Sequence, residues 1–117
     1  MDNESLKSLR LALDLSQERF ARLVGVSVRT VARWEAGDTV PSPLAERQLD
    51  SLVRLYRRLT NILRPDSIDD WMVRPHPGLG QRAPRQVLNT EGPEPLLRLL
   101  DDIPSAFEGG GGGLEDL

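Results

Sequence analysis

Residues 16–37 read SQERFARLVGVSVRTVARWEAG, and this stretch decides the fold. It contains two runs of helical periodicity, Gln17 to Val24 and Val28 to Ala36, and a serine stands directly before each. Serine is a favoured N-cap because its hydroxyl accepts a hydrogen bond from a backbone N–H of the first turn. Gly25 can adopt a positive φ without steric cost, so the first helix can end and the chain can turn within three residues. The stretch therefore predicts two short helices joined by a tight turn.

The apolar side chains of the two runs fall on one side of each predicted helix. They recur at intervals of three and four residues, which bring side chains onto the same helix face. We expect them to pack together, with Val26 at the corner and Ala21 where the helices approach most closely. The apolar set is Phe20, Leu23, Val24, Val31 and Trp34, and the residues expected to face outward on the second helix are Val28, Arg29, Ala32 and Arg33.

Two helices that cross at a tight turn are typical of a helix-turn-helix. In that motif the second helix enters the major groove of DNA, and its N-terminal residues meet the base edges. Arginine at 29 and 33 suits guanine, whose O6 and N7 accept two hydrogen bonds from one guanidinium. A helix-turn-helix that only packs or dimerises is the alternative, because a fold does not by itself fix a function.

A set of residues at fixed spacing carries a family signature within this motif. These residues are Gln17, Phe20-Ala21, Gly25-Val26-Ser27, Thr30-Val31, Trp34-Glu35 and Gly37. In this pattern the chain resembles the Cro/repressor-type family. The resemblance implies phosphate contacts at Gln17, Ser27 and Thr30, and base-reading positions at Val28, Arg29 and Arg33. Because one recognition helix reads few base pairs, we also expect a homodimer on a two-fold symmetric operator.

Composition limits the other possibilities. The chain has 117 residues, of which 38% are hydrophobic, so it can form one domain or two very small ones. It contains no cysteine, which excludes disulfides and thiolate chemistry. It also has no apolar run of membrane-spanning length, and its first ten residues lack the apolar segment of a signal peptide. We therefore expect a soluble, cytoplasmic protein that needs no cofactor or metal.

The charge is divided unevenly along the chain. The net charge is −3, but residues 1–64 hold 11 basic and 8 acidic side chains, whereas residues 65–117 hold 4 and 10. The first segment can neutralise phosphates. The acidic second segment would be repelled by DNA and is better suited to a different partner.

A long helix is predicted after the motif. An initial helix from Glu4 to Leu13 precedes the motif, and two prolines in residues 38–43 interrupt the chain after it. The next helix, Leu44 to Leu63, has a wide apolar stripe and ends before Pro65. Its other face is expected to be a solvated surface and carries Arg47, Arg54, Arg57, Arg58 and Arg64.

Residues 66–103 form a second predicted module of short helices. These are Asp66 to Val73, Pro84 to Asn89 and Glu94 to Ile103, with a loop rich in proline and glycine between the first two. So few residues cannot bury an independent core, so we expect the module to pack on the long helix, on a second copy or on a partner. The whole chain is predicted to be all-α.

The second module carries a signature of its own. Its residues are Trp71-Met72, Pro75, Pro77, Leu79-Gly80, Pro84, Val87-Leu88, Gly92, Leu99-Leu100 and Ile103. Following a helix-turn-helix, this order of features resembles the MbcA/ParS/Xre antitoxin family. The resemblance implies a DNA-binding domain with a long connecting helix at 1–64 and a toxin-binding domain at 65–108. Beyond these the chain departs from the family, and the run of glycines predicts by composition a flexible tail at 109–117, to which no function is assigned. It also implies that the protein inhibits a RES-domain toxin, an enzyme that consumes NAD, and represses the operon encoding both.

The same resemblance implies that the C-terminal end enters the toxin's active-site cleft and blocks NAD. The matching residues are Pro104, Ser105, Ala106, Phe107, Glu108 and Gly109. Phe107 would fill an apolar pocket, and Glu108 would pair with a basic residue that otherwise meets the dinucleotide phosphates. The alternative is a disordered chain end without a function.

The remaining residues offer little catalytic chemistry. His76 stands between two prolines, and neither a catalytic dyad nor a metal site can be assembled around it. Gly78 and Gly80 are explained by turn formation. Trp71 is expected to anchor the core of the module, and a residue of a partner interface is the alternative. An enzyme is therefore disfavoured, and the alternative to an antitoxin is an ordinary repressor whose C-terminal region oligomerises or senses a ligand.

Overall fold

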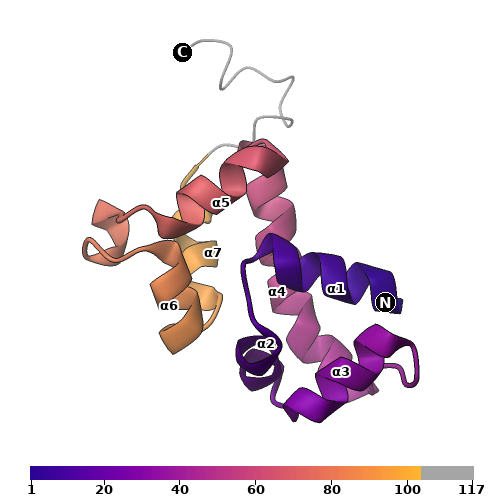
Figure 1. The fold of residues 1–117 in the computed structure, drawn as a ribbon. Coiled ribbons are helices and arrows are strands. Elements are labelled where there is room, and N and C mark those ends of the chain that lie inside the picture. Colours follow the sequence, from indigo (N-terminus) through magenta and orange to yellow (C-terminus); the bar gives the residue numbers. More distant parts are fainter. Residues whose placement is uncertain (104–117) are drawn as a thin grey trace.

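A computed structural model describes residues 1–103 as an all-helical fold, as predicted. Within those residues there is no strand, only an isolated bridge between His76 and Arg82. The elements, shown in Figure 1, are α1 (Asn3–Ala12), α2 (Gln17–Val24), α3 (Val28–Ala36), α4 (Pro43–Ile62), α5 (Pro65–Val73), the 3-10 turn η1 (Pro77–Leu79), α6 (Pro84–Glu91) and α7 (Glu94–Asp101).

The predicted helices agree closely with these bounds. Helices α2 and α3 begin and end at the predicted residues, and the other bounds differ by no more than two residues. Pro65 both follows the long helix and opens α5, since a proline at the first helical position sacrifices no intrahelical hydrogen bond. The 3-10 turn η1 was not predicted and lies inside the loop rich in proline and glycine.

Helix α4 is the axis of the molecule. In one group of helices, α1 and α2 contact α4, and α3 packs on both of them; in the other group, α5 and α7 contact α4, and α6 packs on both of those (Figure 1). Four leucines of α4 are buried at no more than 2% exposure and belong to one hydrophobic cluster that includes residues of both groups of helices. These leucines are Leu49, Leu52, Leu55 and Leu59.

The second module packs on this axis, which is one of the three arrangements expected. Helix α7 buries Leu96, Leu97 and Leu100 and contacts α4 directly. Helices α5 and α6 complete the module, with Met72 and Leu88 fully buried. The small module therefore uses α4 as part of its core.

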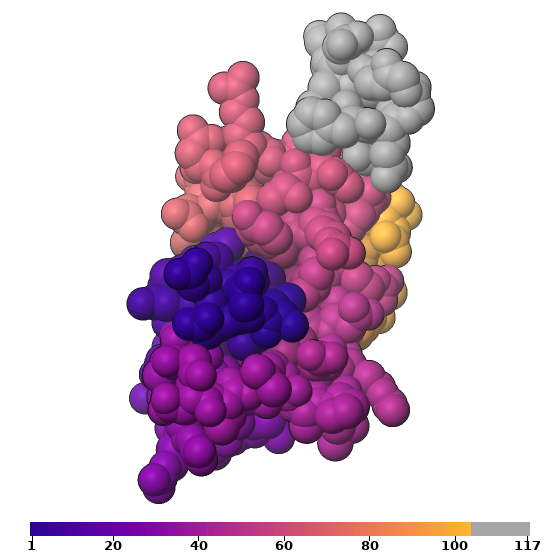
Figure 2. Space-filling view, turned by 90° about the vertical axis from the view of Figure 1, so that its right-hand side faces the viewer, coloured from indigo at the N-terminus to yellow at the C-terminus, as the bar shows by residue number. Residues whose placement is uncertain are grey.

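Figure 2 views the molecule from the side on which α1 lies against α4. Here α1 lies beside α4, and the α3 region lies below α1. Within residues 1–103, none of the helices is both long and apolar enough to cross a membrane.

Candidate DNA-binding surface and partner-binding module

The turn between α2 and α3 has the geometry that its sequence predicts. Ser16 caps α2 by accepting a hydrogen bond from the backbone N–H of Arg19 at 3.1 Å. Ser27 caps α3 in the same way, through the backbone N–H of Thr30 at 3.1 Å. Gly25 ends α2 with φ 83°, in the left-handed region where a side chain is unfavourable. The two caps and the glycine together set the angle between the helices.

Helix α3 presents one buried and one exposed side. Val31 and Trp34 are buried in the core, whereas Val28, in the first turn of the helix, is 43% exposed. Arg29 and Arg33 are also exposed and lie one helical turn apart. The outward orientation expected for these side chains is therefore confirmed, and the exposed side of α3 is basic from Arg29 in its first turn to Arg33 in its last.

The predicted phosphate contacts at the start of α3 already bond to one another. The Oγ of Ser27 lies 2.9 Å from the Oγ1 of Thr30, in addition to its capping bond. A hydroxyl has one donor and two acceptor positions, so this pair keeps some capacity for an outside partner. Their role toward phosphate stays a prediction.

The side chain of Gln17 belongs to a hydrogen-bonded network that was not predicted from the sequence. Its side-chain amide donates to the Oε1 of Glu35 at 3.1 Å. Arg10 donates to both carboxylate oxygens of Glu35, at 2.7 and 2.9 Å, and to the carbonyl of Leu15 at 3.0 Å. The group of Gln17 that stays open to a phosphate is its backbone N–H, which opens α2 and has no intrahelical acceptor.

The Glu35 network is almost closed to solvent. The side chains of Arg10 and Glu35 are 11% and 7% exposed. Burial alone would raise the pKa of Glu35, but the hydrogen bonds from Arg10 and Gln17 outweigh it and hold this pKa below its ordinary value. The carboxylate thus links α1, α2 and α3 and keeps the two helices of the motif in register. A basic residue near the end of a predicted helix, such as Arg10, suggests an interaction with a nearby group. The sequence could not identify Glu35 as its partner, because the two residues are 25 positions apart.

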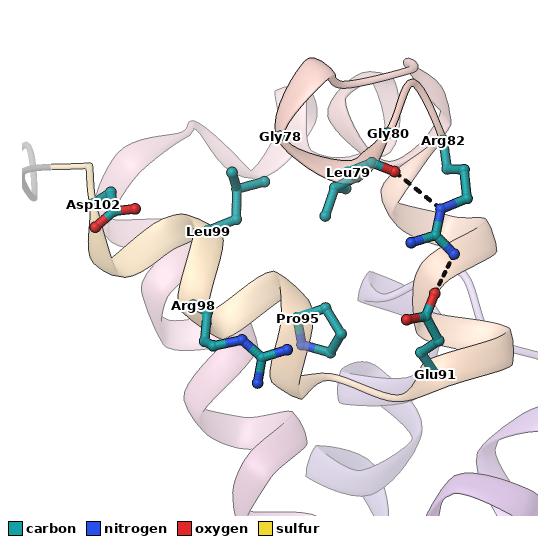
Figure 3. Close-up of a pocket in the computed structure, with 9 residues that line it drawn as sticks. All are labelled: Gly78, Leu79, Gly80, Arg82, Glu91, Pro95, Arg98, Leu99 and Asp102. Carbon is teal, nitrogen blue, oxygen red and sulfur yellow. Dashed lines mark hydrogen bonds and ion pairs between the residues drawn. The ribbon is translucent and has the colours of Figure 1, made fainter.

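The second module has a shallow cavity of about 550 Å³ between η1 and α7 (Figure 3). Arg82 spans one side by pairing with Glu91 and donating to the carbonyl of Leu79 at 2.9 Å. Arg98 and Asp102 are exposed on α7 and at its end. The cavity thus combines paired and exposed charges, which is a surface suited to a polar partner.

His76, Gly78, Gly80 and Trp71 of the second module have structural roles. The Nδ1 of His76 accepts a hydrogen bond from the backbone N–H of Gly78 at 3.0 Å and so caps η1. A Cβ at Gly78 would lie 2.6 Å from the Cδ1 of Leu99, so a side chain at this position would require Leu99 to shift. Gly80 has φ 66°, and Trp71 is half-buried against the core. No cluster of three metal-ligating side chains occurs within residues 1–103.

One arginine of the long helix does not belong to a solvated face, so that expectation is wrong for Arg58. Its side chain is 23% exposed and points at the C-terminal end of α7. One NH2 group donates to the carbonyls of Leu100 and Ile103, at 2.8 and 2.9 Å. The sequence pattern places this arginine outward because it lies outside the apolar stripe of the long helix, but α7 packs over this side of α4.

A crevice of about 470 Å³ separates α2 from α6. Arg19 of α2 lines it on one side, and Arg85 and Asn89 of α6 line it on the other. Arg85 also pairs with Asp14, which follows α1, at 3.2 Å. This ion pair connects the loop before the helix-turn-helix to the second module, although both side chains are partly exposed. The expected toxin-binding segment, Pro104 to Gly109, lies outside the described residues.

Comparison with known proteins agrees with this arrangement. A family model described as helix-turn-helix matches residues 6–45. The mycobacterial cidal antitoxin MbcA of Mycobacterium bovis is 33% identical over 89 residues, covering 76% of this chain and 79% of the relative. MbcA of Mycobacterium tuberculosis matches to the same extent. A chain in the crystal structure of the M. tuberculosis MbcT-MbcA toxin-antitoxin complex superposes with a TM-score of 0.56 at 29% identity, covering 85% of this chain and 89% of that one.

The capped turn and the exposed basic helix define a helix-turn-helix DNA-binding protein. The match extends past the motif into the second module, since the structural match covers 85% of the chain. The chain belongs to the MbcA family of toxin-antitoxin system antitoxins.

Proposed function

We propose that this protein neutralises a RES-domain toxin, an enzyme that consumes NAD, and represses the operon that encodes both proteins. The observation that carries the proposal is the match to MbcA along the helix-turn-helix and the second module together. A solved relative found in complex with its toxin, MbcT, supports a toxin as the partner. The protein acts by binding, without catalysis and without a cofactor, in the cytoplasm.

The DNA-binding activity resides in α2 and α3. Arg29 and Arg33 read guanines from the exposed side of α3, with Val28 beside them at its N-terminus. Phosphates are held by Ser27, Thr30 and the backbone N–H of Gln17. A homodimer places two copies of α3 in successive major grooves, because one copy contacts too few base pairs for a specific site.

The inhibitory activity resides in the second module and the residues that follow it. The segment from Pro104 to Gly109 enters the toxin's cleft and excludes NAD, with Phe107 and Glu108 as its contacts. The acidic excess of residues 65–117 supports this role, because a dinucleotide site must itself be basic to bind phosphates.

The decisive experiment measures NAD consumption by the RES-domain protein encoded beside this chain. Adding the full chain in increasing amounts is expected to abolish NAD consumption at a fixed stoichiometric ratio. When both Phe107 and Glu108 are replaced with alanine, the toxin should still consume NAD at part of its full rate at the same ratio. An Arg29→Ala, Arg33→Ala variant serves as the control and should inhibit like the unchanged chain.

Two outcomes would contradict the proposal. A stable complex in which NAD is consumed at the full rate would show that binding does not block the cleft. No complex at all, combined with intact operator binding, would favour an ordinary repressor whose second module has another use.

A further inference from the structure

The crevice between α2 and α6 is lined by basic and neutral side chains. The two helices belong to different groups and face each other across it (Figure 1). Of the seven residues that line the crevice, two are arginines and none is acidic. Residues 65–103, by contrast, hold 4 basic and 7 acidic side chains. The crevice is therefore a local basic surface at the edge of an acidic module.

Arg85 is directed from the second module towards the helix-turn-helix group. Arg74 and Arg82 pair with acidic residues of their own module. The Nη1 of Arg85 instead lies 3.2 Å from the Oδ2 of Asp14, and the two side chains are 43% and 45% exposed. Because water screens such a pair, it contributes little stability. A guanidinium has five N–H donors, so this contact leaves Arg85 free to bind another acceptor as well.

The other wall of the crevice belongs to a helix that is expected to meet the DNA backbone. In a helix-turn-helix, the first helix of the motif crosses the backbone while the second enters the major groove. Here the first helix is α2, and exposed Arg19 lies in its first turn, two residues after Gln17. The backbone N–H of Gln17 is the phosphate contact proposed above. A DNA strand that passes the start of α2 thus brings its phosphates to the crevice.

The polar groups of the crevice match a phosphate. DNA phosphates are contacted by arginine and by amide and hydroxyl side chains. Besides Arg19 and Arg85, the crevice is lined by the amides Gln86 and Asn89. A phosphate diester has two charged oxygens, so it can accept charge-assisted hydrogen bonds from two guanidinium groups at once.

We propose that α6 of the second module takes part in operator binding, by holding a DNA backbone phosphate in this crevice between Arg19 and Arg85. This inference rests on the proposed DNA-binding role of α2 and α3. The contact adds affinity but carries no sequence information, because phosphates are the same at every nucleotide. The DNA-binding surface then extends from the helix-turn-helix onto the second module.

The test measures DNA binding by full-length variants at several salt concentrations. Arg85→Gln removes the charge from α6, and Arg19→Gln tests the same contact without touching the ion pair with Asp14. Arg98→Gln is the matched control, because it removes an exposed charge of the same module outside the crevice. Asp14→Asn is a second control, because it breaks the ion pair but keeps Arg85. Each variant is titrated with labelled DNA from the promoter of its own operon and with a scrambled duplex.

Arg85→Gln and Arg19→Gln are each expected to weaken binding roughly three- to tenfold, to the promoter and to the scrambled duplex alike. In the double variant, the slope of log K against log salt should become shallower by about 0.9, the value for one phosphate. Arg98→Gln should bind like the unchanged chain. Asp14→Asn should bind at least as tightly, because it removes a negative charge beside the phosphate. A merely structural ion pair would instead give the same loss in Asp14→Asn as in Arg85→Gln.

Unchanged affinity and salt dependence in Arg85→Gln would overturn this inference, and so would an equal loss in Asp14→Asn. If Arg85→Gln binds DNA normally but inhibits the toxin less well, the crevice holds an acidic group of the toxin and the inference fails. In these cases promoter binding that is intact in the unchanged chain, and lost in Arg29→Ala, Arg33→Ala, leaves the proposed function standing. If the unchanged chain does not bind the promoter, the proposed repression and this inference fail together.

Discussion

Glu35 of α3 stabilises the fold through hydrogen bonds from α1 and α2. Its carboxylate accepts from Arg10 and Gln17, and only 7% of its side chain is exposed. Breaking a buried pair by removing one partner leaves the other charge without compensation, which is far costlier than losing a surface ion pair. Here the uncompensated charge would be Arg10, whose guanidinium also holds the carbonyl of Leu15.

We predict that Glu35→Gln lowers the free energy of unfolding by on the order of 3 kcal/mol at neutral pH. The pKa of Glu35 lies below its ordinary value of 4.5 in the folded protein, so its contribution is present above that value. The contribution is lost as the pH falls through the folded pKa. Urea unfolding of both proteins from neutral to acid pH measures this, and the difference between them should shrink as the pH falls. A difference that is constant across this range would contradict the prediction.

Arg29 and Arg33 are the two exposed arginines to which we assign base recognition. Replacing either with alanine should weaken binding to the specific operator by about 1 to 3 kcal/mol for each guanine that the arginine reads. Binding to unrelated DNA should fall much less, because the remaining phosphate contacts are kept. Titration of labelled operator and of scrambled DNA at one salt concentration measures both, and Arg57→Ala is the control. Unchanged operator affinity would remove these arginines from base recognition.

At the scale of the elements, the turn at Gly25 is a position where a substitution would strain the backbone without causing a steric clash. Its φ is 83°, yet a Cβ built there would meet no atom within 4 Å. Gly25→Ala should therefore destabilise the protein by about 1 to 2 kcal/mol through strain alone. Gly25→Asn should cost less, since asparagine tolerates the left-handed region. Thermal unfolding of the two variants compares them, and an equal loss in both would argue against this explanation.

The helices could be predicted because the signals that start and stop them are local. Ser16, Gly25 and Ser27 act on residues within one turn, so their effect is visible in the sequence. The contacts of Arg58 and Glu35 were not predictable, because each joins residues more than 15 positions apart. The exposed side of α3 could be predicted from periodicity. The hydrogen bond from the Gln17 amide to Glu35 could not, because it depends on how α2 packs against α3.

At the scale of the whole molecule, the hydrophobic cluster extends along α4 into both groups of helices. We predict that both groups unfold in one cooperative transition, because neither can be exposed without opening the core beside α4. The chain has two tryptophans, Trp34 in α3 and Trp71 in α5, so each reports on one group.

Trp34→Phe and Trp71→Phe variants each leave one tryptophan to be followed by fluorescence. The unfolding curve from each should coincide with the curve measured by circular dichroism on the same variant. Two fluorescence transitions at different urea concentrations, each departing from the circular dichroism of its own variant, would show that the groups unfold separately.

The central position of α4 also decides how such proteins can be recombined. An engineer who wishes to give this antitoxin a new operator would naturally exchange everything up to residue 64. That graft would replace Leu52, Leu55, Leu59 and Arg58 with the residues of another protein, although all four meet the second module or the shared core. A junction in the loop before Pro43 keeps these residues native. The portable unit for DNA specificity is therefore shorter than the domain that binds DNA.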